Sequence, residues 1–250
     1  METQFNNAFN YVKNMPMKGC LTGSSMLGYI EGGNQDIDLF AYSEKGFTQI
    51  FYHLYYNNKF QILDPLELWK AQKFIEEKGK DNFKFVLTIK FIYNGSIPIN
   101  IIFKNKSKDI FSVLSSFDMD IICKGYDLQT KQYLDLSENL PNKKATWNKW
   151  NTKFYSGEVW DISRILRQLE RCFKYYKRGY NTDDVVLKYI DLIDKLQKFQ
   201  DIFHSINYTD RLKTTKKNTK VVKQICEVWL ETHEITDKQI ELLKEKIKEI

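Results

Sequence analysis

The sequence predicts an α+β fold in two parts, a mixed β-sheet domain over residues 1–150 and an all-helical domain over residues 151–250. Short runs rich in Ile, Val, Phe and Tyr, bounded by Gly, Asn, Ser or Asp, recur through the first part and are typical of strands. After about residue 151 these runs stop, and longer stretches with helical apolar spacing replace them. A chain of 250 residues has ample length to bury a core.

The first part alternates predicted strands with predicted helices, which is the pattern of a mixed α and β domain. The strand-like runs are Met17–Gly23, Asp36–Tyr42, Phe83–Tyr93, Ile97–Phe103 and Asp118–Tyr126. Helical stretches are predicted at Ser25–Ile30, Glu44–Asn57 and Pro65–Glu77. The pair Asn94-Gly95 predicts a tight hairpin between the third and fourth strands, because both residue types tolerate positive φ.

The second part is predicted to be helical throughout. The expected helices are Glu158–Arg178, Asp183–Ile206, Thr219–Thr232 and Thr236–Ile250. Asp183 and Thr236 are plausible N-caps, and Gly179 suits the position just after the first of these helices.

Composition and charge narrow the class of protein. The net charge of +6 permits a polyanionic partner without demanding one. No apolar run is long enough to span a bilayer, and the first residues lack the cationic and apolar regions of a signal peptide. The four cysteines lie far apart and only three histidines accompany them, so no structural zinc is expected. We therefore expect a cytoplasmic protein without a membrane span.

The segment from Leu21 to Leu39 carries the chemistry. A predicted strand ends at Gly23-Ser24 and opens a short helix, so that backbone N–H groups and hydroxyls gather at a possible phosphate site. Asp36 and Asp38 follow on the next predicted strand, and alternation places both on one face. Two neighbouring carboxylates repel each other unless a cation accompanies them, and Mg²⁺ with a phosphate suits such oxygen ligands.

Gly-Ser, a short helix and then Asp-Ile-Asp on the next strand resemble the signature of the DNA polymerase β-like nucleotidyltransferase superfamily. The resemblance implies that Gly23 and Ser24, with Ser25 beside them, hold the triphosphate of an NTP such as ATP. It also implies that Asp36 and Asp38 ligate two Mg²⁺ ions, for which Mn²⁺ could substitute. An acceptor hydroxyl would then attack the α-phosphorus in line and release pyrophosphate.

The family pattern expects a third carboxylate on a later strand. Asp118 is the first choice, because Phe-Asp at this point resembles a subset of stand-alone family members, and Asp120 is the close second. The sequence predicts both on one face of the same strand. Asn100 lies on an earlier strand, where other relatives might place the acid. As an amide it would coordinate only weakly, so it is passed over.

A basic stripe is predicted on the first helix of the second part. Its members recur at helical spacing: Arg164, Arg167, Arg171, Lys174 and Arg178. A solvated amphipathic face explains the stripe equally well. The resemblance to the Arg/Lys-Tyr-Gly segment of stand-alone relatives favours Arg171 and Lys174 as contacts to the triphosphate or the acceptor. The basic segment Arg211–Lys220 is either a solvated loop or a nucleic-acid contact.

These features predict a Mg²⁺-dependent nucleotidyltransferase that moves a nucleoside monophosphate from an NTP to a hydroxyl acceptor. An RNA or tRNA end is the favoured acceptor, and a protein side chain or a small metabolite stays open. Two alternatives share the same residues: an inactive relative that only binds nucleotide or nucleic acid, and a synthase of an oligonucleotide messenger. The sequence does not predict an oligomeric state.

Overall fold

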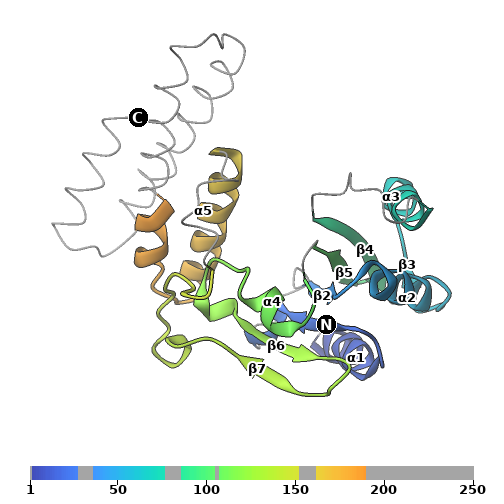
Figure 1. Cartoon of the computed structure of the whole chain (residues 1–250), viewed down its shortest axis with the longest axis horizontal. Helices are drawn as coiled ribbons and strands as arrows, with labels where there is room; N and C mark the ends of the chain where they lie inside the picture. Colours follow the sequence, from blue (N-terminus) through green and yellow to red (C-terminus); the bar gives the residue numbers. More distant parts are fainter. Residues whose placement is uncertain (1, 28–35, 77–85, 105–106, 152–161, 190–250) are drawn as a thin grey trace, which may run out of the picture. The chain divides into compact units, whose positions relative to one another are not determined.

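The computed structural model describes residues 2–27, 36–76, 86–104, 107–151 and 162–189. The chain forms two compact units (Figure 1). The first comprises residues 1–138 and 148–151, and the second comprises residues 139–147 and 152–250. Among the described residues, no helix combines the length and the apolar character that crossing a bilayer requires.

A seven-stranded mixed sheet organises the first unit, which confirms the α+β prediction for this part of the chain. In chain order the strands are β1 (Gly19–Thr22), β2 (Ile37–Ala41), β3 (Phe60–Gln61), β4 (Leu87–Tyr93), β5 (Ile97–Phe103), β6 (Lys124–Asp127) and β7 (Tyr133–Asp135). Their order across the sheet is β3-β4-β5-β2-β1-β6-β7. The central β2 and β5 run parallel, and all the other neighbours run antiparallel.

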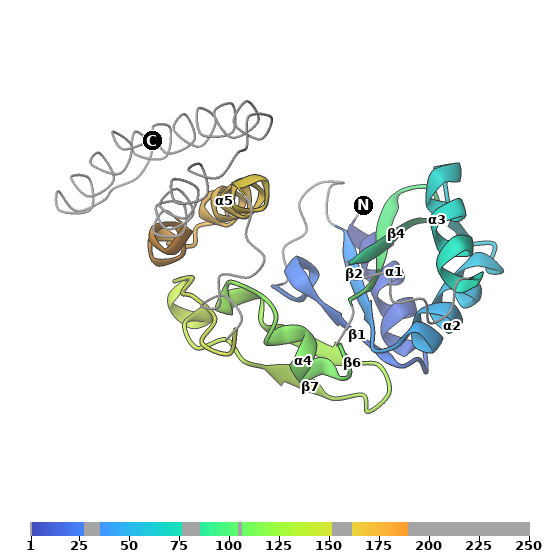
Figure 2. The ribbon, with the colours of Figure 1, turned by 45° about the horizontal axis from the view of Figure 1, so that its top comes forward.

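Three helices pack on one face of this sheet: α1 (Glu2–Asn14), α2 (Glu44–Tyr55) and α3 (Pro65–Glu76). Figure 2 shows α2 and α3 on one side of the strands and α4 (Ile110–Leu114) on the other. The α2 helix begins where predicted, because the side chain of Ser43 accepts a hydrogen bond of 3.0 Å from the N–H of Gly46.

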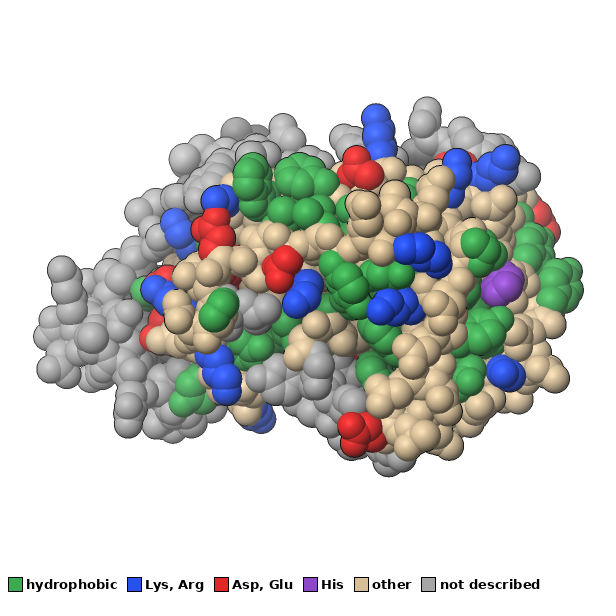
Figure 3. Space-filling model, turned by 90° about the horizontal axis from the view of Figure 1, so that it is seen from below, with side chains coloured by type: hydrophobic (Ala, Val, Ile, Leu, Met, Phe, Trp, Pro, Cys, Tyr) green, Lys and Arg blue, Asp and Glu red, His purple; other side chains and the backbone are tan. Residues whose placement is uncertain are grey.

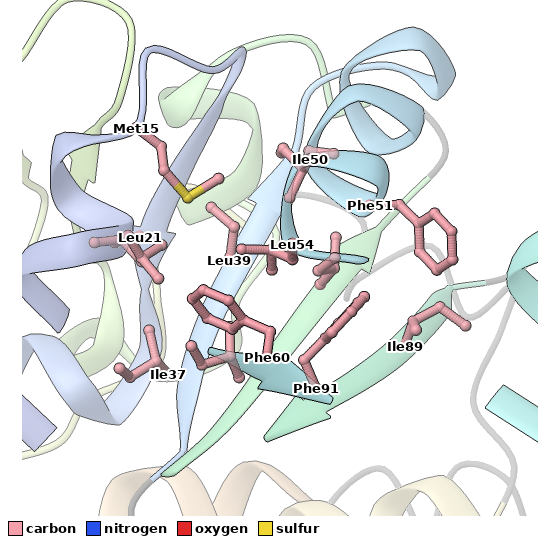
Figure 4. Close-up of a cluster of buried hydrophobic side chains, with 14 of the residues drawn as sticks. Met15, Leu21, Ile37, Leu39, Ile50, Phe51, Leu54, Phe60, Ile89 and Phe91 are labelled. Atoms are coloured by element: carbon pink, nitrogen blue, oxygen red, sulfur yellow. The ribbon is translucent and has the colours of Figure 1, made fainter. Parts of the chain in front are cut away.

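The main core lies between these helices and the sheet (Figure 4). Alternate residues of the strands face it, so Ile37 and Leu39 of β2 are fully buried against α2 side chains such as Ile50. In β4 the buried residues alternate with exposed ones, Lys90 among the latter. Each buried aliphatic or aromatic side chain contributes about 1.5–3 kcal/mol. This burial fixes which face of each strand is left for polar residues.

A smaller apolar cluster covers one end of the opposite face. Cys20, Phe40, Ile102 and Val113 form it, with α4 packed above them. Burial raises the pKa of the Cys20 thiol to about 12, so this cysteine stays protonated and is not a nucleophile. Asp36 and Asp38 lie on this same face, toward the start of β2, where they are only half-buried.

The hairpin prediction is confirmed, and one strand prediction is wrong. Asn94 and Gly95 adopt φ values of 45° and 71° and connect β4 to β5. The run Asp118–Tyr126 is not one strand, because the 3₁₀ turn η2 (Asp120–Ile122) interrupts it and β6 begins only at Lys124. The apolar residues of this run are buried by the turn, and hydrophobicity alone does not distinguish a buried turn from a strand.

The second unit contains α5 (Ile162–Lys177) and a further helix over residues 183–189. Gly179 follows α5 with φ of 83°, as predicted for a residue that ends a helix, and its N–H donates to the Tyr176 carbonyl. Asp183 is the first helical residue rather than the N-cap, and its N–H donates to Asn181 Oδ1. The helices predicted beyond residue 189 lie outside the described residues.

Asp127 anchors the turn after β6, and its removal is expected to destabilise the first unit by about 2 kcal/mol. Its Oδ1 accepts from the N–H groups of Gln129 and Thr130, and its Oδ2 accepts from Tyr42 Oη at 2.6 Å. Burial alone would raise the pKa of Asp127, but these hydrogen bonds outweigh it and lower the pKa below the ordinary 3.8.

The stabilisation from Asp127 is therefore present above pH 3.8 and lost as the pH falls through the lower value that the folded protein has. Urea unfolding of the wild type and of Asp127→Ala should differ at neutral pH and converge in acid. Asp127→Asn, which keeps an acceptor for the two N–H groups, should lose less than Asp127→Ala. A difference between wild type and Asp127→Ala that stays constant down to low pH would contradict this assignment.

Candidate active site

Strand register places a row of polar side chains across one face of the sheet. Thr22 of β1 lies opposite Asp38 of β2, Asp38 lies beside Asn100 of β5, and Asn100 lies opposite Lys90 of β4. Residues paired across a ladder share a face of the sheet. The row therefore places a carboxylate, an amide and a lysine side by side, on the face opposite α1, α2 and α3.

The two predicted aspartates meet at one amide group. Asn100 Nδ2 donates to Asp36 Oδ2 at 2.7 Å and to Asp38 Oδ1 at 3.0 Å. All three side chains are half-buried. Because one nitrogen reaches both carboxylates, Asp36 and Asp38 lie close together on one face of the sheet, as strand alternation predicted.

The Gly-Ser turn lies directly against this pair. β1 ends at Thr22, and the predicted short helix is the 3₁₀ turn η1 (Gly23–Leu27). A Cβ atom placed on Gly23 would lie 2.6 Å from Asp38 Oδ2, and Gly23 has φ of +81°. Both facts require glycine at this position. The backbone of the turn therefore approaches the carboxylate more closely than any side-chain-bearing residue would allow.

The two serines of the turn are buried. Ser25 Oγ donates to the Thr22 carbonyl at 3.2 Å, so this hydroxyl stabilises the turn, while Ser24 is 7% exposed. Thr22 Oγ1 donates in turn to the Lys124 carbonyl at 2.8 Å and ties β1 to β6. These bonds hold the turn in place beside Asp38.

Asp118 and Asp120 lie around η2, near η1 in the fold. Both side chains are 4% exposed, and the Asp118 carbonyl accepts from the N–H of Asn148 at 2.7 Å. Within the described ranges, no three His, Cys, Asp or Glu side chains form a group that could hold a metal ion. Asp36 and Asp38 both contact the amide of Asn100, a residue that sequence reasoning passed over.

The described side chains of the basic stripe differ in exposure. Lys174 is exposed, and Arg171 Nη1 donates to Gln168 Oε1 at 2.7 Å. Arg178 is only 7% exposed and its guanidinium lies 5.4 Å from the centre of the Tyr175 ring. Contact with the Tyr175 ring therefore stabilises the charge of Arg178. The side chains of Arg164 and Arg167, and the segment Arg211–Lys220, lie outside the described residues.

An aromatic patch lies on the α2 face, away from the carboxylates. Tyr52 and Tyr56 stack with ring centroids 5.7 Å apart, and Tyr56 is 77% exposed. Together with His53 and Lys59 they line a surface hollow, and Figure 3 shows hydrophobic and lysine side chains near the histidine on this face. A second hollow of about 630 Å³ lies between α1 and β7 beside Ser25. Asp36, Asp38 and Asn100 line neither hollow.

Two residues of the polar row, Asn100 and Lys90, were not selected from the sequence. Lys90 interrupts an apolar strand at an outward position, which is a common pattern for a solvated lysine. Only the strand order, which places β4 beside β5 and β5 beside β2, brings both residues into line with Asp38. β2 and β5 pair in parallel although more than sixty residues of chain separate Asp38 from Asn100. A local sequence pattern does not indicate such a pairing.

No protein-family model matches the sequence, and no curated protein matches it. Solved structures of CCA-adding enzymes are similar at low scores. They include the Thermotoga maritima enzyme complexed with tRNA (14% identity, TM-score 0.33), an enzyme complexed with CTP (15%, 0.37) and an apo form (13%, 0.36). Each comparison covers 97% of this chain but only 63–65% of the other, so the chain spans less than two thirds of their length. Its function is therefore inferred from the geometry of its own site.

Proposed function

We propose that the chain is a Mg²⁺-dependent nucleotidyltransferase that moves a nucleoside monophosphate from an NTP to a hydroxyl acceptor. The contact of Asp36 and Asp38 with one amide nitrogen, directly beside the Gly23 turn, carries this proposal. A carboxylate pair next to a backbone turn free of side-chain bulk is an arrangement that suits transfer at a phosphate.

The donor set fits a hard divalent cation. The two carboxylates supply oxygen ligands, which Mg²⁺ prefers, and no sulfur or imidazole competes at the described contacts. Bound there, Mg²⁺ would supply positive charge against the phosphates and would acidify the attacking hydroxyl. Asp36 and Asp38 would hold it, and Asp118 remains our proposed third carboxylate, with Asp120 as the alternative.

The other residues of the site would bind and orient the substrate. Gly23, Ser24 and Ser25 would offer backbone N–H groups to the triphosphate, with Gly23 directly against Asp38. Lys90 places an exposed ammonium on the same face, beside Asn100. Arg171 and Lys174 are our proposed contacts to the triphosphate or the acceptor. An RNA or tRNA end is the proposed acceptor, which the net charge of +6 permits.

A second candidate function is binding without transfer. It is favoured by one observation, the neutral Asn100 in contact with both aspartates. Retained NTP affinity with no transfer to any acceptor, in Mg²⁺ or in Mn²⁺, would support it. Loss of measurable transfer in Asp36→Ala and Asp38→Ala, with NTP affinity retained, would support the enzyme.

The acceptor can be found by incubating the chain with each of the four α-labelled NTPs and Mg²⁺, with and without bulk tRNA. Label that enters tRNA identifies an RNA acceptor. Label that appears in short oligonucleotides without tRNA identifies a messenger synthase. If neither product forms, protein and small hydroxyl acceptors are the next to be supplied.

Lys90→Gln is expected to raise the KM for NTP or for the acceptor by about tenfold, because a charge-assisted hydrogen bond to phosphate would be lost. The melting temperature should not change, since the side chain is exposed. Lys73→Gln removes the same charge from α3 on the other side of the sheet and serves as the control. Equal KM values for the two variants would exclude Lys90 from substrate binding.

A further inference from the structure

Asn100 contacts the carboxylate pair through only one end of its amide. Its nitrogen donates to both Asp36 and Asp38, as only the NH₂ end of an amide can do toward ionised carboxylates. Its carbonyl oxygen takes no part in either bond. The carbonyl oxygen, which is the atom of Asn100 that can ligate a cation, is therefore not used in these two hydrogen bonds.

We propose that Asn100 is a positioning residue of the carboxylate pair. Its NH₂ group holds Asp36 and Asp38 together when no cation is bound, and its carbonyl oxygen turns toward the cation when one binds. This inference rests on the proposed function, because it assigns a role in the same site. The change requires only a rotation of the terminal amide, which is a soft torsion.

A rotation of the Asn100 amide would not require movement of the backbone. Ile99 and Ile101 on either side are fully buried on the opposite face of the sheet. The ladder fixes β5 between β2 and β4, with Asn100 paired to Asp38 on one side and to Lys90 on the other. The ladder thus holds the backbone of the strand, and the half-buried side chain is the part that would turn.

A neutral residue at this point also sets the charge of the site. Asp36, Asp38 and Asn100 together carry two formal negative charges, and an aspartate at position 100 would add one more. Cation affinity rises with the number of charged ligands. We therefore expect the free chain to bind a divalent cation weakly and to bind it better when a triphosphate brings further negative oxygens.

The test is a titration of the full chain with Mn²⁺ alone. Calorimetry measures the affinity, and thermal melting measures the stability with and without Mn²⁺. Asn100→Asp should bind Mn²⁺ about tenfold or more tightly than the wild type, because it adds a charged ligand. Without Mn²⁺ it should melt at a lower temperature, because three carboxylates then repel one another, and Mn²⁺ should restore it. Asn100→Ala should bind Mn²⁺ more weakly than the wild type.

Asn58→Asp is the matched control, because it adds the same charge at an exposed turn after α2 and should leave Mn²⁺ affinity unchanged. If Asn100→Asp binds Mn²⁺ no more tightly than Asn58→Asp, Asn100 does not face the cation and the inference is overturned. If Asn100→Asp fails to fold even with Mn²⁺, Asn100→Ala decides, and an affinity equal to that of the wild type overturns the inference.

Asp38→Asn separates this inference from the proposed function. If Asp38→Asn removes Mn²⁺ binding while the Asn100 variants behave like the control, only the role of Asn100 is wrong. If Asp38→Asn binds Mn²⁺ as the wild type does, the carboxylate pair is not the cation site. The proposed function then fails together with the inference.

Discussion

Asp38→Asn is expected to reduce nucleotidyl transfer by about 10³-fold or more, equivalent to about 4 kcal/mol of activation free energy. Asp38 is the centre of the polar row, since it lies opposite Thr22, beside Asn100 and against the Gly23 turn. Asparagine keeps the shape but removes the charge that a divalent cation requires. The fold should survive, because the side chain is half-buried and belongs to neither apolar cluster.

Initial rates of transfer from an α-labelled NTP, compared with NTP affinity from equilibrium binding, measure this effect. Asp36→Asn should behave similarly, because Asn100 contacts both carboxylates. Glu44→Gln removes one negative charge from the exposed first turn of α2 and should retain full activity. Transfer by Asp38→Asn at a rate close to that of Glu44→Gln would exclude Asp38 from the reaction.

Gly23→Ala should reduce transfer by about 10²-fold, because the added Cβ would displace Asp38 or open the turn. The Cβ atom would lie 2.6 Å from Asp38 Oδ2, and only movement of one of these groups can relieve the contact. Alanine is also unfavourable at φ of +81°, by about 1–2 kcal/mol. The contact with Asp38 would lower transfer activity, whereas the backbone strain would lower stability, so the two effects can be separated.

Gly95→Ala provides the comparison. Gly95 has a similar φ of +71°, but a Cβ atom there would meet nothing within 4 Å. Both variants should therefore lose a similar part of their stability from backbone strain in urea unfolding. Only Gly23→Ala should lose transfer activity. If Gly95→Ala loses as much activity, the defect comes from general destabilisation and the close approach of Gly23 to Asp38 has no catalytic meaning.

Local chemistry made the central elements of the first unit predictable. Runs rich in Ile, Val, Phe and Tyr indicated β2, β4 and β5, and Asn94-Gly95 indicated the hairpin that joins β4 to β5. Asp36 and Asp38 could be paired from their spacing alone, because strand alternation is a local property. The Gly-Ser turn was predictable because it also depends only on neighbouring residues.

What sequence reasoning missed depends on contacts between distant segments. Asn100 reaches Asp38 only because β5 pairs in parallel with β2. The residues of neither strand indicate that the other strand is its neighbour. The apolar run around Asp120–Ile122 predicts a strand but forms a buried turn, because its apolar residues pack in the core rather than in a ladder. The strands β3 and β7 were not predicted, because they have only two and three residues. The helix α1 was also missed, although its buried Phe5, Ala8 and Val12 recur at helical spacing.

The position of the label in the products tests the central claim most directly. The chain is supplied with Mg²⁺ and with one NTP labelled either at the α-phosphate or at the γ-phosphate. If Asp36 and Asp38 support attack on the α-phosphorus, the α-label will pass to the acceptor and the γ-label will leave in pyrophosphate. A γ-label found on the acceptor, or an α-label transferred equally well by the Asp36→Asn/Asp38→Asn double variant, would contradict the account.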